Sequence, residues 1–579
     1  MKHEPTEKQR YVLQSSDNLV VVGTPGTGKT TLALWKAQRF ITENNLLRHE
    51  RVLFMSFSNA AVARIHEAAK LRLPRKVRRH LTVTTFHSLC FGLLRSHSRL
   101  LGLSGTFQLF PPEDVTILRN QGGTDVEREL GRLEREESRI CFDRFAPLTR
   151  QILEGHEPIR LAYSRSFPLV IVDEYQDTSD DEDQVMRLLT RDGQLICLGD
   201  PEQRIYDFRP GTHAGRLAQL QADPQFESVQ LENTNHRSGG ADIVPCARAV
   251  LEGTGAIPKP ERVVAWSYRT HKSLADSLKK AIVSLERAVR RQKGQPDARV
   301  TVAIMGMTNA FVGQLSRLLK TPSKTFERPF SHQVLVSYED LCVAWDTALI
   351  VLEGSYDART CAVQTLRSAA RLDLLRGSAT AKEHASTLQR WSEALESEGG
   401  RAPASVKRLV AAIEEMDGAW TGDPVEDLAS VREMLRRIPG KHFARTVTLL
   451  DLRLPAGPGE SATPLLTELF RERRNYSGCR RIVSDVVLRE RLTETQGGRA
   501  RRLLMTLHKC KGKEFDGVII VDGLGPPNRL LLRHESVESC PASRKLLSVA
   551  LTRARYAAVV FSPAWDRCAL LPAFRAKGT

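Results

Sequence analysis

A glycine-rich segment near the N-terminus has the residue types and spacing of a phosphate-binding loop. Residues 23–30 follow an apolar run and match the pattern GxxxxGK[ST]. Glycines allow main-chain N–H groups to curl around phosphate oxygens, and the expected following helix directs its positive N-terminus at the same anion. In this pattern Lys29 reaches the terminal phosphates and the Thr30 hydroxyl ligates Mg²⁺. The segment predicts a site for a nucleoside triphosphate with Mg²⁺, formed by Gly23, Thr24, Pro25, Gly26, Thr27, Gly28, Lys29 and Thr30.

A pair of acidic residues, Asp173 and Glu174, follows a second apolar run at 169–172. A buried strand that ends in two acids would place carboxylates beside the phosphate loop. Asp173 would then hold Mg²⁺ through its water shell, and Glu174 would orient and deprotonate an attacking water. In isolation such a pair is more often a helix cap, but together with the loop it predicts nucleotide hydrolysis.

These groups need a scaffold, and short apolar runs indicate one. Helical patterns lie between most of the runs, and unbroken apolar strands that alternate with helices imply parallel sheets covered on both faces. The sequence therefore predicts an α/β fold. The expected strands are residues 19–22, 52–55, 169–172, 195–198, 300–305, 503–505, 518–521 and 557–561.

The expected strands fall into two groups, and a mostly helical stretch interrupts each group. We expect a first core at 1–92 and 165–228 with a short helical insertion at 93–164. A second core is expected at 229–340 and 500–579, with a helical insertion at 341–499. Helices within this second insertion are expected at 380–398, 405–416 and 425–437.

The composition bounds the class of protein. Among 579 residues, 85 are Lys or Arg and 68 are Asp or Glu, which gives a net charge of +17. This surplus suggests a polyanionic partner such as nucleic acid, although a general compositional bias would look the same. No apolar run is long enough for a membrane span, and residues 1–10 lack a signal core, so a cytoplasmic protein without membrane partners is expected. The ten scattered cysteines argue against a zinc finger and favour reduced thiols.

The stretch Asp-Glu-Tyr-Gln-Asp-Thr at 173–178, together with the phosphate loop, resembles the UvrD/Rep family of superfamily 1 helicases. This resemblance implies two RecA-like P-loop ATPase cores that couple ATP hydrolysis to stepping along single-stranded or tailed DNA in the 3′→5′ direction. Further stretches match the family's motifs in order: residues 6–10, 56–61, 84–88, 199–209, 235–238, 505–516 and 549–555.

The resemblance also assigns roles around the nucleotide. Gln9 would contact adenine, Glu514 would bond the ribose, and Gln203 would sense the γ-phosphate. Arg237 and Arg553, both from the second core, would be arginine fingers that stabilise charge in the transition state. The expected catalytic residues are Lys29, Glu174, Gln203, Arg237 and Arg553.

Two positions depart from the family's adenine site. His236 stands where the family commonly has tyrosine, and Thr31 stands where it often has arginine. An imidazole offers less area for stacking than a phenol ring, and threonine offers none. Both changes predict a looser grip on adenine by His236 and Thr31 than is usual in the family.

DNA contacts are implied for a set of polar and aromatic residues. Aromatic faces hold any base at about 1–3 kcal/mol each, without sequence preference. Phe208 replaces a more usual tryptophan, so its stacking should be weaker. Without the surrounding motifs, Gln9 would belong to an ordinary helix start and His87 would be a core histidine. The implied DNA-binding residues are Phe57, Asn59, His87, Tyr206, Phe208, Arg209 and His508.

Both insertions are shorter than is usual in the family, which predicts a compact translocase whose duplex unwinding is weak without a partner. Compact chains of this kind resemble helicase subunits of prokaryotic antiviral operons, such as Gabija-type systems with a separate nuclease subunit. Basic clusters flank the motifs and would contact DNA phosphates or form solvated faces. They comprise Arg72, Arg75, Lys76, Arg78 and Arg79; Arg471, Arg473, Arg474, Arg480 and Arg481; and Arg499, Arg501 and Arg502.

Two other hypotheses about the function remain open. One is a nucleotide-gated DNA-binding sensor or regulatory subunit of a nuclease-containing antiviral or repair complex, with little processive unwinding. The other is an RNA helicase, because no motif here reads the 2′-hydroxyl. The sequence favours the enzyme because the full catalytic set is present, whereas a pure binding module would tolerate the loss of some of it.

Overall fold

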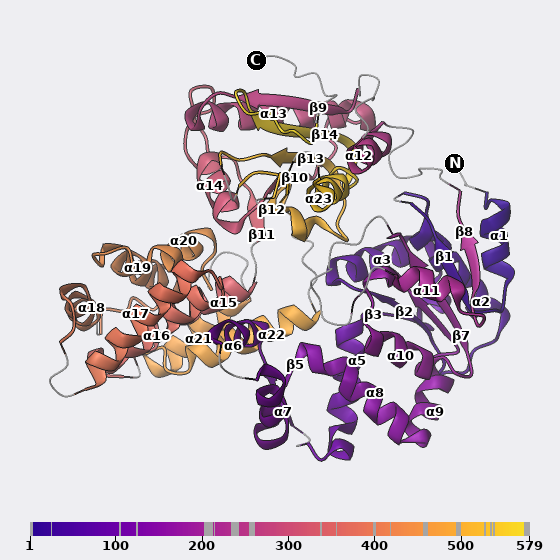
Figure 1. Cartoon of the computed structure of the whole chain (residues 1–579), viewed down its shortest axis with the longest axis horizontal. Coiled ribbons are helices and arrows are strands. Elements are labelled where there is room, and N and C mark those ends of the chain that lie inside the picture. The colour runs from indigo at the N-terminus through magenta and orange to yellow at the C-terminus, as the bar shows by residue number, and fades with distance from the viewer. Residues whose placement is uncertain are drawn as a thin grey trace. The chain divides into compact units, whose positions relative to one another are not determined.

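The computed structural model describes most of residues 4–571, and Figure 1 shows its elements. The chain forms two compact units. The first comprises Met1–Gly105, Asp143–Leu335 and Glu494–Thr579, and the second comprises Thr106–Phe142 and Val336–Thr493. Not described are residues 25, 104–105, 123–124, 202–211, 213–214, 233–241, 254–260, 336–337, 355, 398–400, 417, 456–460, 494–499, 526–527, 533–534 and 537–538, and the side chains of 271–272, 489 and 491–493.

The N-terminal core of the first unit is built on a six-stranded sheet in the order β3-β2-β6-β7-β1-β8, with every pairing parallel. Alternate residues such as Leu19 and Val21 pack against α1, α2 and α3. Val20 is also fully buried, so the opposite face is covered too. The bounds are β1 (Leu19–Val22), β2 (Val52–Ser56), β3 (Leu81–Thr85), β6 (Leu169–Val172), β7 (Gln194–Gly199), β8 (Glu227–Gln230), α1 (Glu7–Gln14), α2 (Lys29–Glu43) and α3 (Asn59–Arg72).

The order of the central strands positions the predicted chemistry. β6, β7 and β1 are neighbours and run parallel, so their carboxyl ends meet at one edge of the sheet. The phosphate loop follows β1, Asp173 follows β6, and Asp200 follows β7. The remaining helices of this core are α4 (Arg75–Arg78), α5 (Phe86–His97), α8 (Phe145–Gly155), α9 (Glu157–Ser166), α10 (Asp180–Leu189) and α11 (Arg216–Ala222).

A second six-stranded sheet, in the order β11-β12-β10-β13-β14-β9, is also parallel throughout. Ala303 and Met305 pack with α12 and α23 on one face, and Ile304 between them is buried on the other. The bounds are β9 (Val263–Tyr268), β10 (Val302–Gly306), β11 (Gln333–Leu335), β12 (Arg502–Thr506), β13 (Phe515–Val521), β14 (Ala554–Pro563), α12 (Ile243–Glu252), α13 (His271–Lys293), α14 (Asn309–Lys320) and α23 (Pro541–Leu551). The predicted α/β class with parallel sheets is confirmed.

The second unit is mostly helical, with one short parallel pair, β4 (Gln108–Phe110) and β5 (Arg139–Cys141), that the sequence did not predict. Helix α6 (Pro112–Gln121), from the chain between β3 and β6, joins helices from between β11 and β12. The Asn120 side-chain amide donates to the Leu374 carbonyl at 2.8 Å. The other helices are α7 (Val126–Glu137), α15 (Tyr338–Glu353), α16 (Ala358–Leu374), α17 (Ala379–Glu396), α18 (Ala404–Glu414), α19 (Pro424–Arg437), α20 (Ala444–Leu452), α21 (Ala462–Arg473) and α22 (Cys479–Thr493).

Two features of the whole chain bear on its class. None of the described helices combines the length and apolarity needed to cross a membrane. All ten cysteines lie among the described residues, and no disulfide joins any of them.

Candidate active site

The phosphate loop adopts a conformation that its glycines permit. Gly26 and Gly28 have φ angles of 89° and 84°, in the left-handed region that side chains disfavour. A Cβ atom at Gly23 would lie 2.7 Å from the Thr27 hydroxyl, closer than such atoms approach. Gly28 caps α2, so the N-terminus of this helix lies at the loop. These residues adopt the backbone conformation that suits an anion-binding turn, and their contact with phosphate stays a prediction.

Lys29, the first residue of α2, lies at the centre of the loop. Its ammonium donates to the carbonyl of Gly23 and, at 3.2 Å, to that of Thr24. It also lies 3.9 Å from the Asp200 carboxylate, and its side chain is only 12% exposed. The carbonyls and carboxylate thus hold the cation beside the position where the loop would bind phosphate.

The first acidic residue of the predicted pair contacts the loop directly. The Thr30 hydroxyl donates to Asp173 Oδ2 at 3.1 Å. Burial, followed by the neighbouring Glu174 carboxylate, raises the pKa of Asp173 to about 6. A cation would stabilise such a buried carboxylate, and Mg²⁺ prefers oxygen ligands. Thr30 and Asp173 therefore have the oxygen ligands that would hold a magnesium ion.

Glu174 has a strained backbone and an ionised side chain. Its φ angle of 61° is left-handed, which is uncommon for a residue with a side chain and concentrates at functional sites. Burial opposes ionisation, but Lys511 and Lys29, followed by Arg553, hold the pKa of Glu174 below its ordinary value. The Gln176 amide also donates to Glu174 at 2.5 Å. A buried carboxylate that stays charged is suited to accept a proton from water.

Gln176 links Glu174 to the end of the neighbouring strand. Its amide nitrogen donates to Glu174, while its carbonyl oxygen accepts from the Asp200 main-chain N–H at 3.0 Å. Gln176 is itself buried. No pattern in the sequence indicates this role for Gln176 or Asp200, because their contact depends on β6 and β7 being neighbours in the sheet.

A cavity of about 290 Å³ joins these groups to side chains of the second core. Most of the predicted nucleotide residues line it, together with three arginines that the prediction of this site left out. Five of the lining side chains are basic and three are acidic, so the cavity favours an anionic ligand. The lining residues are Gly26, Thr27, Gly28, Lys29, Thr30, Thr31, Arg64, Arg72, Asp173, Glu174, Glu514, Arg553 and Arg555.

Arg553 is held rigidly where it faces this cavity. It follows α23 and is only 2% exposed. Its guanidinium donates to the Val549 carbonyl and to the Thr552 hydroxyl, both at 3.0 Å. Contacts within its own chain segment therefore set the direction of the charge before any ligand binds.

The two cores are joined by ion pairs beside the cavity. Lys511, which precedes β13, contacts Asp177 of the first core, and both side chains are buried. Glu514 accepts from Arg64 Nη1 at 2.5 Å and from Arg555 Nη2 at 3.1 Å.

The three arginines that the site prediction left out are Arg64, Arg72 and Arg555. Arg72 donates to the Thr31 hydroxyl at 2.8 Å, although the sequence suggested a DNA-phosphate role for it. Helical spacing alone could not place α3 against the loop, so no sequence signal identified Arg64 or Arg72. Arg555 lies in a matched motif, in which Arg553 was the residue singled out.

Seven predicted and described residues lie outside the cavity lining, and two of them, Gly23 and Thr24, belong to the phosphate loop itself. Gln9 is buried in α1, where its side chain accepts from the Thr6 N–H at 3.2 Å and completes a capping box. Asn59 begins α3, and half-buried Phe57 precedes it. The ring of His87, in α5, lies 6.3 Å from that of Phe145, and His508 is exposed. Their proposed contacts with adenine or DNA stay predictions.

Several predicted residues lie outside the described part of the chain. They include one residue of the loop, the residues expected to contact the γ-phosphate and to stack on adenine, and three residues expected to contact DNA. They are Pro25, Gln203, Tyr206, Phe208, Arg209, His236 and Arg237.

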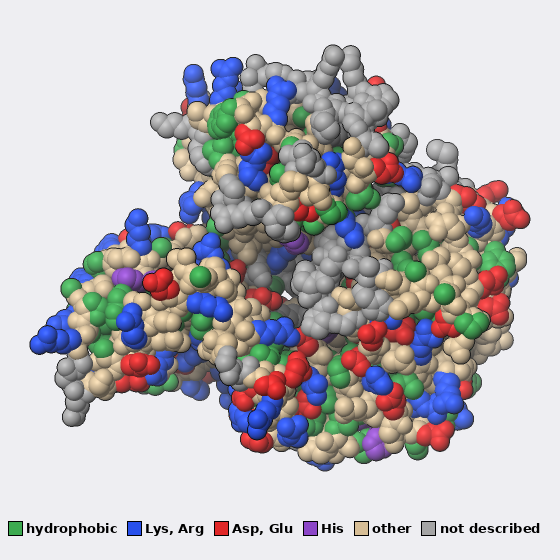
Figure 2. All heavy atoms as spheres, viewed as in Figure 1, with side chains coloured by type: hydrophobic (Ala, Val, Ile, Leu, Met, Phe, Trp, Pro, Cys, Tyr) green, Lys and Arg blue, Asp and Glu red, His purple; other side chains and the backbone are tan. Residues whose placement is uncertain are grey.

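The basic surplus belongs to the unit that holds the two sheets. The second unit contains 27 Lys and Arg against 31 Asp and Glu, so the first unit carries the whole net positive charge. Single members of two basic clusters form ion pairs within the chain, since Arg480 pairs with Asp346 and Arg502 with Glu286. On the face in Figure 2, basic and acidic side chains are interspersed.

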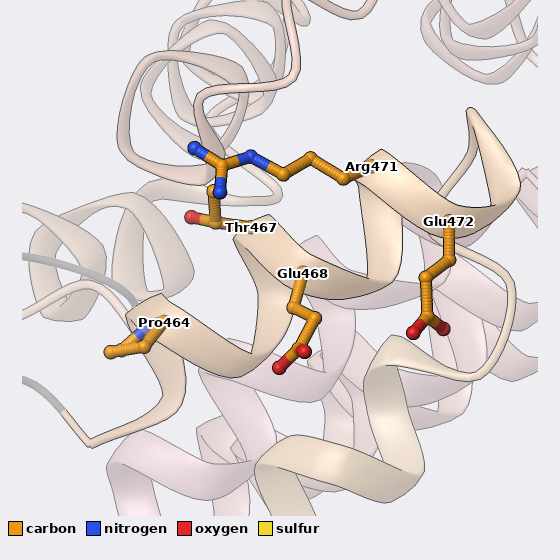
Figure 3. A pocket seen from close by; sticks show the side chains of 5 residues that line it. All are labelled: Pro464, Thr467, Glu468, Arg471 and Glu472. Atoms are coloured by element: carbon orange, nitrogen blue, oxygen red, sulfur yellow. The ribbon is translucent and has the colours of Figure 1, made fainter.

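A larger hollow, of about 680 Å³, lies along α21. Figure 3 shows Glu468 and Glu472 pointing to one side of this helix, with Arg471 extending along the other. The described lining comes from one helix, and its opposite charges diverge. This hollow therefore lacks the convergent groups of a chemical site.

Comparisons with known proteins agree with the site. The profile of the UvrD/REP helicase N-terminal domain matches residues 5–137 and 124–224, which carry the loop and the acidic pair. The ATP-dependent DNA helicase PcrA of Leuconostoc citreum is 24% identical over 292 residues, 42% of this chain and 38% of the relative. The N-terminal part of the chain is thus similar to the UvrD/Rep helicases. ATP-dependent DNA helicase UvrD1 of Mycobacterium tuberculosis is 26% identical over 304 residues (43% and 39%), and ATP-dependent DNA helicase Rep of Escherichia coli is 25% identical over 286 residues (42% of each). The matches thus span about two fifths of these relatives' length.

Proposed function

We propose that this chain is a UvrD/Rep-type ATP-dependent translocase or helicase that steps along single-stranded DNA in the 3′→5′ direction. One observation carries the proposal: a single cavity joins the phosphate loop and the Asp173–Glu174 pair of one core to Arg553 of the other. A site built from both cores ties hydrolysis to their relative position.

The chemistry follows from the charges of the site. Glu174 orients the attacking water and takes its proton, because neighbouring cations keep it ionised although it is buried. Lys29 and Arg553 stabilise the charge that develops on the transferred phosphoryl group. Thr30 and Asp173 would hold Mg²⁺, which would supply positive charge to neutralise the phosphate oxygens of ATP.

Hydrolysis can drive movement because the γ-phosphate site is complete only when both cores contribute. Loss of that phosphate removes a shared anion between Lys29 and Arg553 and favours opening of the cores. If the cores alternate in their grip on a strand, each ATP cycle becomes a step. The second reading, a nucleotide-gated DNA sensor, shares the binding site but not the turnover.

DNA is the proposed polymer along which the chain moves. The relatives are named DNA helicases, and the first unit of this chain carries the net positive charge. The helical unit carries more acidic than basic residues, so it offers little electrostatic attraction to duplex DNA. Weak unwinding by the isolated chain is therefore expected. A separate nuclease subunit would supply any cleavage activity, and co-purification with the products of neighbouring genes would test this.

Strand displacement tests the proposal. Partial duplexes with a 3′ or a 5′ single-stranded tail are incubated with the chain and ATP, and streptavidin release from biotinylated single strands measures translocation separately. We expect release from 3′-ended streptavidin blocks to be slow and from 5′-ended blocks to be fast, with little duplex unwinding. The reverse polarity would contradict the direction, and DNA binding without turnover would favour the sensor. Arg39→Ala, which changes an exposed residue of α2, serves as a control variant that should behave like the unmodified chain in both assays.

A further inference from the structure

Arg64 occupies an unusual position for a residue outside the phosphate loop. It lies on α3 and lines the same cavity as Lys29 and Thr30. Its Nη1 group donates to Glu514 of the second core at 2.5 Å. One side chain thus contacts the opposite core and faces the nucleotide cavity.

The Arg64 guanidinium has donor capacity that Glu514 does not use. A guanidinium carries five N–H donors in a planar fork. Arg64 Nε is buried, and no described residue accepts a hydrogen bond from it. A buried charged donor without an acceptor is costly, and a ligand oxygen would remove that cost. The positive charge of Arg64 also acts on the acidic pair, because it is one of the charges that lower the pKa of Asp173.

Glu514 is held by two guanidinium groups. Oε1 accepts from Arg64 of the first core, and Oε2 accepts from Arg555 of its own core at 3.1 and 3.3 Å. A ribose hydroxyl that bonded Glu514 would compete with one of these arginines. Phosphate and carboxylate both match the fork of a guanidinium, so Arg64 can exchange one anion for the other without losing its pairing.

We propose that Arg64 binds the β- or γ-phosphate of the nucleotide and that, in the nucleotide-free chain, Glu514 of the second core holds it. Nucleotide binding then exchanges the partner of Arg64 and releases one Glu514 oxygen. This inference rests on the proposed function, because it requires the cavity to bind ATP. It makes Arg64 a nucleotide-binding residue that exchanges an inter-core ion pair for a phosphate contact.

Nucleotide affinity across a phosphate series tests the proposal. The dissociation constants of ATP, ADP and AMP are measured by calorimetry for the unmodified chain, Arg64→Ala and Arg64→Lys, with Arg39→Ala as control. Because hydrogen bonds between charged groups are strong, Arg64→Ala should weaken ATP binding at least about tenfold. AMP binding should change little, and Arg64→Lys should recover part of the ATP affinity.

Two results would overturn the role of Arg64 while the unmodified chain still binds ATP. One is unchanged ATP affinity in Arg64→Ala. The other is an equal loss for ATP and AMP, which would assign Arg64 to holding the cores alone. If the unmodified chain does not bind ATP, and Lys29→Ala has the same lack of ATP affinity, the proposed function itself is overturned.

Discussion

The buried ion pair between Lys511 and Asp177 gives the sharpest stability prediction. The two side chains are 4% and 0% exposed, and the pair joins the two cores near the Glu174 carboxylate. A surface pair of this kind would contribute at most about 1 kcal/mol. Removing one partner of a buried pair costs about 3–5 kcal/mol, because the other charge stays buried without compensation.

Lys511→Met and Asp177→Asn should therefore each lower the first unfolding transition of the chain by several degrees. The double variant should recover most of that loss, since replacing both charges removes the uncompensated one. Only Lys511→Met also removes the foremost cation that keeps the pKa of Glu174 low, so it should reduce ATP turnover more than Asp177→Asn does.

Thermal unfolding followed by fluorescence measures the first effect, and steady-state ATP hydrolysis measures the second. If the single variants unfold at the same temperature as the unmodified chain, the Lys511–Asp177 pair does not contribute to stability as proposed. Additive losses in the double variant would refute the coupling between Lys511 and Asp177.

Three further predictions follow from the site. Glu174→Gln should still bind ATP but hydrolyse it about 10²–10⁴-fold more slowly in single-turnover assays, and near-normal hydrolysis would exclude Glu174 as the base. Gln176→Leu should lower kcat with little change in ATP affinity, because it loses the amide that positions Glu174; an effect on KM alone would argue against this. Affinity for single-stranded DNA, measured by fluorescence anisotropy, should fall with salt at a slope of about −0.7 per phosphate contact, and a flat response would contradict electrostatic binding.

The central strands of both sheets were predictable because they are buried on both faces and appear as unbroken apolar runs. The strands that the sequence analysis missed in these sheets, β3, β8, β9 and β11, are the four edge strands. An edge strand is partly exposed, so polar residues interrupt its pattern, as in the alternating burial of β3. Strand prediction from apolar runs thus failed for strands that have a neighbouring strand on one side only and solvent on the other.

The same reasoning explains which site residues were found. Lys29, Thr30, Asp173 and Glu174 lie in local motifs directly after central strands, and the cavity brings them together. Arg64 reaches the cavity only because α3 packs against this particular sheet edge, and no local pattern encodes that approach. The joining of α6 with α15 and α16 likewise depends on packing between distant segments of the chain.

ATP hydrolysis with and without single-stranded DNA tests the central claim most directly. The unmodified chain should hydrolyse ATP faster when DNA is added, and Lys29→Ala, which loses the cation at the phosphate loop, should abolish hydrolysis at every DNA concentration. Tight DNA binding by the unmodified chain with no ATP turnover would contradict the account.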